Sequence, residues 1–573
     1  MRQVLSGHGA SRGNALGRAR VRLPHVLEVA EDHIDADAVD AELARLHEAI
    51  ETVRAEMLAL RDRLQGALAH EVGEFIDMHT LLLDDPELLR GLEELICKGL
   101  YGANYALRLQ RDRLAAVFAE MDDAYFRNRI DDIDHVIGRL HAALHKRAAD
   151  VQGAAGEILV AENVAPSELA QLQSQGVMAI VTTGGSALSH SAILARSLHL
   201  PLVVGAAHAL QQVNDGDVLI VDGSSGRLVV EPDAADLRAF RTRVRGEQRE
   251  RKQLHRLRRE PSRTVDGVDI RIFANAESRE DVAEAHALGA AGIGLYRTEF
   301  LFMGDVLPDE EAQFRAYRDV ALGMTGRTVT IRTLDIGADK ADRTGLALSD
   351  EPNPALGLRG VRLSLARGDV FEAQMRAIVR ASGYGPVRVL VPMVSAREEM
   401  VAVAALLKRV KRDLTSEGHE VAEHIPLGAM IEVPAAAIAL PGFIDTVDFL
   451  SIGTNDLVQY LLAADRNNEA LGELYTPLHP ALLRLLESVI RIARRRGKPV
   501  AVCGEMAGDA TFAPLLLALG LEEFSLHPGT LLELRRAIRT CDLGALRARA
   551  PALLRAHDRA GIEKWLKVNT PAP

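Results

Sequence analysis

The feature that most constrains the fold is a run of eight strand-like segments that begins at about Val265. They read VDIRIFAN, GIGLYRTEF, VTIRTLDIG, LRGVRLSL, VRVLVPM, LGAMIEVP, DFLSIGTND and PVAVCGEM, and segments of helical periodicity separate them. Eight strands that alternate with helices predict a (β/α)8 barrel. A doubly wound open sheet, which shows the same alternation, is the alternative architecture.

The remainder of the chain indicates three further parts. Residues 31–149 place apolar side chains three and four apart, as in AVDAELARLHEAIETVRAEMLALRDRL, which predicts a helical bundle. Residues 150–232 hold short β-branched runs such as DVLIVDG, and residues 1–30 are expected to join them in one strand-rich β/α domain that the bundle interrupts. Residues 233–263 are highly charged and predict a linker helix. With residues 264–573 as the barrel, the predicted fold class is multidomain α/β.

Composition excludes several classes of protein. A net charge of −12 argues against broad nucleic-acid binding and suits a basic protein partner. The three cysteines are far apart and match no zinc spacing, which is typical of a reducing cytoplasm. The N-terminal residues lack the apolar core of a signal peptide, and no run of about 18 apolar residues predicts a membrane span. A cytoplasmic location is therefore expected.

Ionisable and polar residues follow most of the eight segments, where the active site of a barrel lies. Arg297 and Glu299 follow the second segment, Arg332 and Asp335 the third, with Lys340 in the loop beyond, and Arg359 flanks the fourth. Glu432 follows the sixth, Asn455 and Asp456 the seventh, with Arg466 downstream, and Cys503 and Glu505 the eighth. Several arginines and a lysine that converge on one point predict a multiply anionic ligand, because the guanidinium fork fits phosphate or carboxylate.

Three of these residues indicate chemistry beyond anion binding. Glu432 and Asp456 would repel each other unless a cation lay between them, and Mg²⁺ held by two carboxylates and phosphate oxygens is the favoured interpretation. The alternative is that both carboxylates pair with the arginines. Cys503 is either a small buried apolar residue or, given the charged groups around it, a proton donor or nucleophile.

A second candidate site lies in TTGGSALSHSAILARS, Thr182 to Ser197. His190 falls in the expected first turn of a helix, with Ser189 as a possible N-cap. The free backbone N–H groups and the helix dipole favour an anion there, and neutral histidine is a competent nucleophile. By itself such a histidine more often has a structural role, whereas the anion-binding barrel expected downstream favours a phosphate carrier.

Taken together, these segments resemble the phosphoenolpyruvate–protein phosphotransferase family, Enzyme I of the sugar phosphotransferase system. The resemblance extends over nearly the whole chain. It includes, in family order, MHTLLLDDPEL, APSELAQL, GGSALSHSAILARS, GLYRTEFLFM, IRTLDIGADK, NPALGLRGVRL, VPMVS, DFLSIGTNDLVQYLLAADRNN and CGEMAGD.

The resemblance implies a mechanism. Phosphoenolpyruvate would bind with Mg²⁺ in the barrel, held by Arg297, Arg332, Lys340, Arg359, Asn455 and Arg466, with Glu432 and Asp456 as metal ligands. His190 would become the phosphohistidine, on a domain that swivels, and Cys503 would protonate the enolate to pyruvate. The bundle would dock the small phosphocarrier protein HPr, with Glu71, Glu74, Asp84, Asp85 and Glu87 facing a basic partner. The family also forms homodimers through the barrel.

Some residues depart from the family pattern, and two related functions remain as alternatives. The turn GGSALSH is longer than usual, Leu169 replaces a hydroxyl residue, and His527 and Pro528 replace small residues. A regulatory, nitrogen-type phosphorelay protein would use the same chemistry, but usually has a sensory GAF domain that is not expected here. A dikinase or phosphoenolpyruvate synthase would need an ATP-grasp domain, for which the bundle is too short.

Overall fold

The computed structural model describes residues 2–22, 31–63, 76, 79–119, 124–145, 155–164, 166–185, 189–198, 200–303, 306–337, 346, 351–465, 471 and 474–570. The chain divides into two compact units, Met1–Gln248 and Arg249–Pro573. Each unit has its own apolar cores. None of the helices in the described part is long and apolar enough to cross a lipid bilayer.

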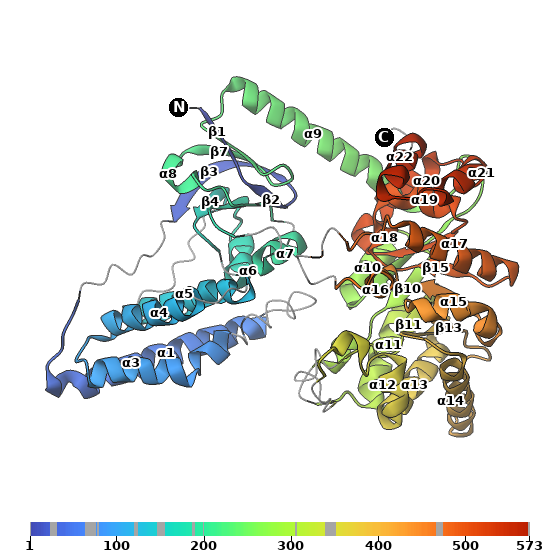
Figure 1. Cartoon of the computed structure of the whole chain (residues 1–573), viewed down its shortest axis with the longest axis horizontal. Helices are drawn as coiled ribbons and strands as arrows, with labels where there is room; N and C mark the ends of the chain where they lie inside the picture. Colours follow the sequence, from blue (N-terminus) through green and yellow to red (C-terminus); the bar gives the residue numbers. More distant parts are fainter. Residues whose placement is uncertain are drawn as a thin grey trace. The chain divides into compact units, whose positions relative to one another are not determined.

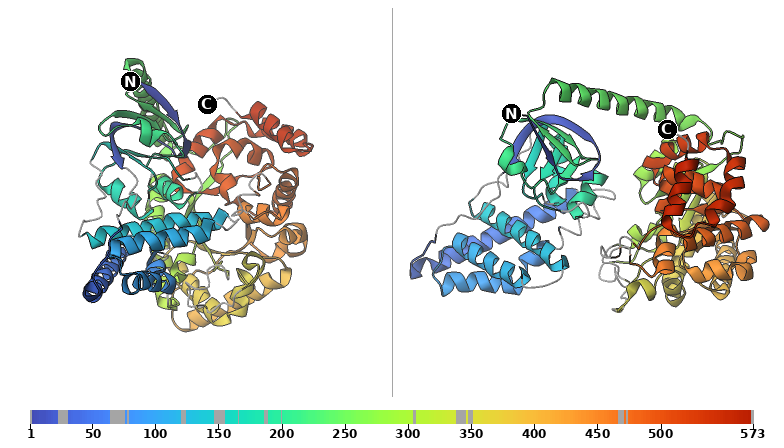
Figure 2. Two further views of the ribbon diagram at one scale, coloured as in Figure 1. Left: turned by 60° about the vertical axis from the view of Figure 1, so that its left-hand side comes forward. Right: turned by 45° about the horizontal axis from the view of Figure 1, so that its top comes forward.

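The first unit contains a helical bundle made of α1 (Val39–Arg63), α3 (Pro86–Cys97), α4 (Ala103–Ala119) and α5 (Ala124–Leu144). These helices lie side by side (Figures 1 and 2). The α3 helix shows how the sequence specifies them. Asp85 caps its first turn by accepting a hydrogen bond of 2.7 Å from the Glu87 N–H, and Leu88, Leu92, Leu95 and Ile96 form its buried stripe.

The first unit also contains an eight-stranded sheet in the order β1-β8-β7-β3-β4-β5-β6-β2. Its strands are β1 (Gln3–Ser6), β2 (His8–Ser11), β3 (Asn14–Arg22), β4 (Glu157–Ala161), β5 (Ala179–Thr182), β6 (Leu202–Val204), β7 (Val218–Asp222) and β8 (Arg227–Val230). The helices α6 (Pro166–Ser174), α7 (His190–Ser197) and α8 (Ala209–Gln212) connect the later strands. The central strands β3 to β6 are parallel, and the chain between β3 and β4 forms the bundle.

Both faces of the sheet are buried along the strands β4 to β7. In β4, Leu159 and Ala161 belong to the core shared with α6, α7 and the bundle, whereas Ile158 and Val160 belong to a second core on the other face. This alternation explains why the strand sequences are almost continuously apolar. The sheet therefore holds α7, and with it His190, against a packed apolar layer.

The charged segment after the sheet is the long helix α9 (Ala234–Arg256), none of whose side chains is buried. Arg243 forms an ion pair with Asp222 in the first unit. Near the other end of the helix, Glu250 forms an ion pair of 2.6 Å with Arg536 in the second unit. The helix thus runs continuously across the boundary between the units.

The second unit is a closed barrel of eight parallel strands. The strands are β9 (Arg271–Ala276), β10 (Gly292–Tyr296), β11 (Thr328–Arg332), β12 (Val387–Val391), β13 (Leu427–Ile431), β14 (Phe449–Ile452), β15 (Val500–Val502) and β16 (Glu523–Leu526). The barrel, rather than the open sheet, is therefore the architecture. Residues of one strand alternate between two cores: Val389 and Val391 contact the surrounding helices, while Leu390 joins Leu295 and Met430 in the interior.

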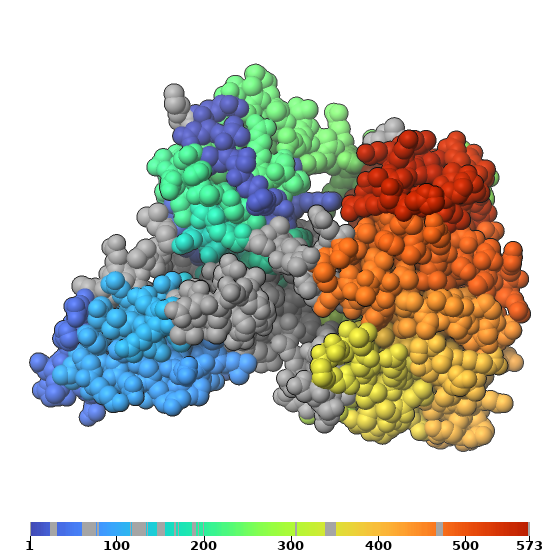
Figure 3. Space-filling view, viewed as in Figure 1, coloured from blue at the N-terminus to red at the C-terminus, as the bar shows by residue number. Residues whose placement is uncertain are grey.

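The helices that surround the barrel follow in chain order. They are α10 (Arg279–Ala287), α11 (Glu310–Gly323), α12 (Val361–Ala366), α13 (Gly368–Ala381), α14 (Arg397–Ser416), α15 (Pro434–Phe443), α16 (Thr454–Leu462), α17 (Pro480–Arg495), α18 (Glu505–Gly508), α19 (Ala513–Ala518), α20 (Leu531–Thr540), α21 (Leu543–Leu554) and α22 (Arg559–Asn569). Figure 3 shows the later segments of this unit next to one another in sequence order, from yellow through orange to red.

The prediction was wrong for one of the eight expected strands, and it missed one strand of the barrel. LRGVRLSL forms the helix α12, because a short apolar alternation is also compatible with one helical turn that buries Val361 and Leu363. The barrel closes instead through β16, which pairs with β15 and β9. Its sequence EFSL begins with the charged Glu523, which pairs with Arg271, so the segment lacks a strand-like pattern. Glu432, Asp456 and Cys503 consequently follow the fifth, sixth and seventh strands.

Candidate active site

The parallel strands bring the predicted polar residues to the carboxyl end of the barrel. Arg297 directly follows β10, and Arg332 is the last residue of β11. Glu432 directly follows β13, Asp456 lies in the first turn of α16 after β14, and Cys503 directly follows β15. Because all eight strands run in the same direction, these residues share one mouth of the barrel.

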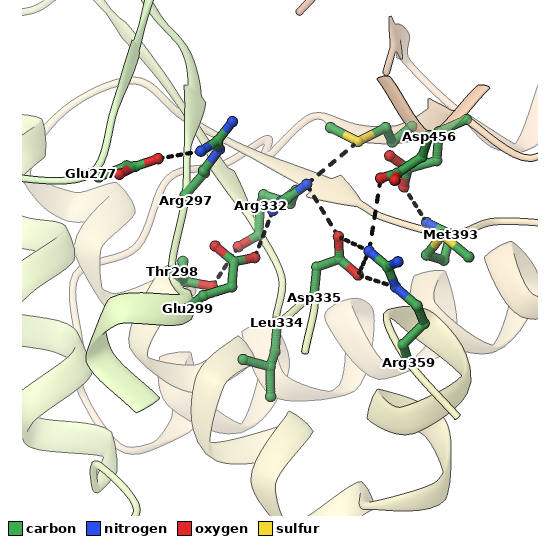
Figure 4. Close-up of polar contacts among 12 residues, drawn as sticks. Glu277, Arg297, Thr298, Glu299, Arg332, Leu334, Asp335, Arg359, Met393 and Asp456 are labelled. Carbon is green, nitrogen blue, oxygen red and sulfur yellow. Dashed lines mark hydrogen bonds and ion pairs between the residues drawn. The ribbon is translucent and has the colours of Figure 1, made fainter. Parts of the chain in front are cut away.

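A chain of alternating charges crosses this mouth (Figure 4). The Arg332 guanidinium lies between two carboxylates, 2.7 Å from Glu299 and 3.3 Å from Asp335. Asp335 also accepts hydrogen bonds of 3.1 and 3.2 Å from Arg359. Arg359 in turn lies 3.7 Å from an oxygen of Asp456. Each guanidinium is thus held by carboxylates on two sides.

Arg332 and Arg359 remain charged although only 11% and 17% of their side chains are exposed. Burial by itself disfavours their charge, but Glu299, Asp335 and Glu432 outweigh it and raise the pKa of Arg332 above its ordinary value. Asp335 and Asp456 likewise raise the pKa of Arg359 above its ordinary value. Among the described residues, the buried Arg332 Nε atom has no hydrogen-bond partner. An anionic ligand is the group that such a donor suits.

Glu432 is the most deeply buried carboxylate of the mouth, with 1% of the residue exposed. It accepts a hydrogen bond of 2.6 Å from the Met393 N–H. Burial, and then the charges of Asp335 and Asp456, raise the pKa of Glu432 to about 8. A Cβ atom on Gly453 would lie 2.7 Å from its second oxygen, so glycine at that position leaves room for the carboxylate.

The donors in this region fit a magnesium ion. Mg²⁺ prefers oxygen ligands, and the charges of Asp335 and Asp456, after burial, raise the pKa of Glu432, so a nearby cation would relieve repulsion among these carboxylates. Within the described ranges, no group of three or more His, Cys, Asp or Glu side chains is arranged to hold a metal. Two carboxylates would therefore hold the ion only together with oxygens of water or of a ligand.

Further polar contacts fix the rim of the mouth. Arg297 forms an ion pair with Glu277, which follows β9. The Asn455 side-chain amide donates to Glu505 at 3.1 Å and accepts from its backbone N–H at 2.9 Å. The Tyr460 hydroxyl accepts a hydrogen bond of 3.3 Å from Arg359 and donates to the Ala355 carbonyl.

Cys503 combines features of both interpretations that its position allowed. It is 4% exposed and packs with Leu295, Leu390, Met430 and Phe449 in the interior core. Burial, together with the nearby Glu432 charge, raises the pKa of the Cys503 thiol to about 11. Its thiol is therefore protonated at neutral pH and can act as a proton donor, which a thiolate cannot.

His190 is the first residue of α7, as its sequence predicted. The Ser189 hydroxyl accepts a hydrogen bond of 3.2 Å from the Ala192 N–H, which confirms the N-cap. Leu169, on α6, is completely buried in the adjoining core. The His190 side chain, Lys340 and Arg466 lie outside the described residues.

Two residues of the mouth escaped the sequence prediction. Glu277 directly follows β9, one of the two expected strands after which no polar residue was expected to contribute. Tyr460 lies four residues after Asp456 on α16, so the two side chains share a helix face, and that spacing was an available signal. Asp335 and Glu299 were expected at strand ends, but their role as partners of Arg332 becomes visible only in the structure.

Comparisons with known proteins identify the class of enzyme to which this barrel belongs. The family model of the PEP-binding domain of PEP-utilising enzymes matches residues 251–543. The models of the N-terminal and mobile domains of PEP-utilising enzymes match residues 6–129 and 153–226. The chain is thus built from the three parts of a PEP-utilising enzyme.

Curated relatives specify the family. The chain is 44% identical over 569 residues to a phosphoenolpyruvate-protein phosphotransferase of Cupriavidus necator, with 97% of each chain covered. It is 40% identical to a protein of that name from Geobacillus stearothermophilus, over 94% of this chain and 93% of the relative. A relative of the same name from Staphylococcus aureus is 39% identical, with 94% of each chain covered. The chain belongs to the phosphoenolpyruvate-protein phosphotransferase family.

Proposed function

We propose that this protein transfers the phosphoryl group of phosphoenolpyruvate to His190, releases pyruvate, and passes the phosphate to a histidine of the carrier HPr. The observation that carries this proposal is the pair of largely buried, charged guanidinium groups of Arg332 and Arg359 at the barrel mouth. They lie beside the buried carboxylate of Glu432 and the partly buried carboxylate of Asp456. A multiply anionic substrate with a metal ion complements this arrangement of charges.

Binding of the substrate falls to the arginines. Arg297, Arg332 and Arg359 would hold its phosphate and carboxylate through charge-assisted hydrogen bonds, with Asn455 at the rim. We assign Lys340 and Arg466 to the same task from their positions in the family motifs. Because Arg332 and Arg359 are already held between carboxylates, little side-chain entropy remains to be lost when the substrate binds.

Glu432 and Asp456 would hold the magnesium ion. When bound, Mg²⁺ neutralises negative charge on the phosphoryl oxygens. The protein's own contribution is to keep one buried and one partly buried carboxylate near Arg359, which lies 3.7 Å from Asp456. A phosphoryl group at that point would be surrounded by positive charge, which favours its transfer to a neutral nucleophile.

The chemical step requires a nucleophile and a proton donor. A ring nitrogen of His190 would attack phosphorus, so that the phosphorus–nitrogen bond forms while the bond from phosphorus to the enolate oxygen breaks. The enolate then needs one proton on carbon to become pyruvate. The Cys503 thiol, protonated at neutral pH because its pKa is about 11, would supply it and regain a proton from solvent afterwards.

The further steps follow from the family. We assign residues 31–149 to HPr binding, residues 1–30 and 150–232 to the swivelling phosphohistidine domain, 233–263 to the linker and 264–573 to the phosphoenolpyruvate barrel, which forms a homodimer. We place the protein in the cytoplasm, at the first step of sugar uptake. A regulatory, nitrogen-type relay with the same chemistry is the alternative, and a dikinase would require ATP-dependent labelling of His190.

Labelled phosphoenolpyruvate tests the central assignment. In the presence of Mg²⁺, the protein should take up one acid-labile phosphate per chain and pass it to HPr. His190→Ala should take up none, whereas His208→Ala, which changes an exposed histidine at the start of α8, should behave like the wild type. Phosphate uptake by the His190 variant equal to that of the wild type would refute the assignment.

A further inference from the structure

A buried amide lies behind the carboxylates that hold Arg332. Gln374 on α13 is 1% exposed. Its side chain accepts a hydrogen bond of 2.9 Å from the Leu334 backbone N–H and donates bonds of 3.2 Å to the hydroxyls of Thr298 and Tyr317. Thr298 and Tyr317 are themselves completely buried. These bonds are therefore shielded from competition with water.

The hydrogen-bond partners determine the orientation of this amide. The Leu334 N–H can only donate, so it must face the amide oxygen. The Thr298 hydroxyl donates its proton to the Arg332 carbonyl at 3.0 Å, and the Tyr317 hydroxyl donates to Gln313 at 3.2 Å. Both hydroxyls are then acceptors for the two N–H groups of Gln374, and the network is consistent throughout.

The positions of these partners connect the network to the site. Thr298 immediately precedes Glu299, and Leu334 immediately precedes Asp335. Glu299 and Asp335 are the two carboxylates on either side of the Arg332 guanidinium. Figure 4 shows Thr298 beside Glu299 and Leu334 below Asp335. The Gln374 amide thus links the ends of β10 and β11 next to the two carboxylates that hold Arg332.

We propose that Gln374 is a positioning residue that sets the spacing of Glu299 and Asp335 and thereby orients the Arg332 guanidinium toward the substrate. This inference rests on the proposed function, because it assumes that Arg332 binds phosphoenolpyruvate. Gln374 does not touch the substrate. It acts through two backbone segments, and a shift of either segment moves one of the carboxylates that hold Arg332.

A purely structural role for Gln374 makes a different prediction. In that case any loss from the buried network would lower stability, and substrate binding would change little. Tyr317→Phe is the matched control, because it removes one hydrogen bond of the same amide and leaves the bonds to Thr298 and Leu334 in place. Gln374→Met keeps the volume but loses all three bonds, and Thr298→Val removes the hydroxyl that joins Gln374 to the Arg332 carbonyl.

Two measurements on the full-length protein test the inference. The first is hydrogen–deuterium exchange of the Leu334 amide, which does not depend on any activity. Exchange should rise about tenfold or more in Gln374→Met and stay near the wild-type rate in Tyr317→Phe. The second is the kinetics of phosphate uptake from phosphoenolpyruvate. The kcat/KM value should fall about tenfold or more in Gln374→Met and Thr298→Val, chiefly through KM, and by less than about twofold in Tyr317→Phe.

The outcomes separate this inference from the proposed function. Equal kcat/KM values in Gln374→Met and Tyr317→Phe, or unchanged exchange at Leu334 in Gln374→Met, would overturn the positioning role. A wild-type protein that takes up no phosphate from phosphoenolpyruvate would refute the proposed function. If Leu334 exchange still differed between the variants, that result would support the link between the strand ends independently.

Discussion

Replacement of Glu432 by glutamine tests the electrostatics of the barrel mouth. The folded protein raises the pKa of Glu432 from an ordinary value of 4.5 to about 8, chiefly through burial and then through Asp335 and Asp456. Because the folded pKa lies above the unfolded one, the stability from this group is complete below about pH 4.5. It is lost as the pH rises through about 8. At about 1.4 kcal/mol per unit of pKa, the complete loss is about 5 kcal/mol.

Glutamine removes the ionisation and keeps an oxygen that can accept the Met393 N–H. Without metal, the free energy of unfolding of the variant, relative to the wild type, should therefore increase between pH 5 and pH 9, by up to about 5 kcal/mol. Excess Mg²⁺ should stabilise the wild type at pH 8 and have little effect on the variant, because only the wild type keeps both proposed metal ligands.

Urea unfolding in EDTA measures this difference. Trp565, the only tryptophan of the chain, lies on α22 in the second unit and reports unfolding of the barrel. Glu284→Gln, which changes an exposed glutamate on α10, is the control and should show the pH dependence of the wild type. Parallel stability curves for wild type and Glu432→Gln between pH 5 and pH 9 would refute the reasoning.

Three further predictions concern the thiol, a glycine and an arginine of the site. The rate of Cys503 alkylation by iodoacetamide should still increase with pH at pH 9.5, because the Cys503 thiolate forms only near pH 11. Peptide mapping measures this rate, with the exposed Cys97 as internal comparison, and a rate that stops rising near pH 9 would contradict the prediction. Gly360→Ala should lower the free energy of unfolding by about 2 kcal/mol or more, because φ is +57° and the new Cβ would lie 2.6 Å from a buried methionine. Gly368→Ala, which meets no atom within 4 Å at the start of α13, should be neutral or stabilising in the same denaturation assay, and equal losses would refute the reasoning. Arg359→Lys should raise the KM for phosphoenolpyruvate about tenfold or more in steady-state assays, since an ammonium group cannot make the paired contacts of a guanidinium, and an unchanged KM would exclude that role.

Local patterns in the amino-acid sequence predicted much of the architecture. Apolar runs separated by helical periodicity predicted the barrel, and seven of its strands lie in the expected segments, because these strands are buried on both faces and are therefore nearly all apolar. The exceptions are informative. β16 begins with Glu523, whose charge is favoured by Arg271 on β9 and Arg388 on β12. LRGVRLSL forms α12 because short alternations do not distinguish a strand from a helical turn.

The composition of the site was also predictable, but its internal pairing was not. The rule that barrel active sites lie at the carboxyl ends of strands selected Arg297, Arg332, Glu432, Asp456 and Cys503 from their positions alone. No local pattern indicated that Asp335 contacts two arginines, or that Tyr460 reaches Arg359. Such contacts depend on side chains from segments up to about 100 residues apart.

The amino-acid sequence by itself therefore determined which residue types stand at which strand ends, and with them the class of chemistry. Only the tertiary structure decided which of these groups pair with one another and which of them are charged. Burial at the barrel mouth raises the pKa of Glu432 and of Cys503, while carboxylates on two sides keep Arg332 and Arg359 charged. The physical reason is that desolvation and Coulomb interactions depend on distance in space, which a local sequence pattern does not contain.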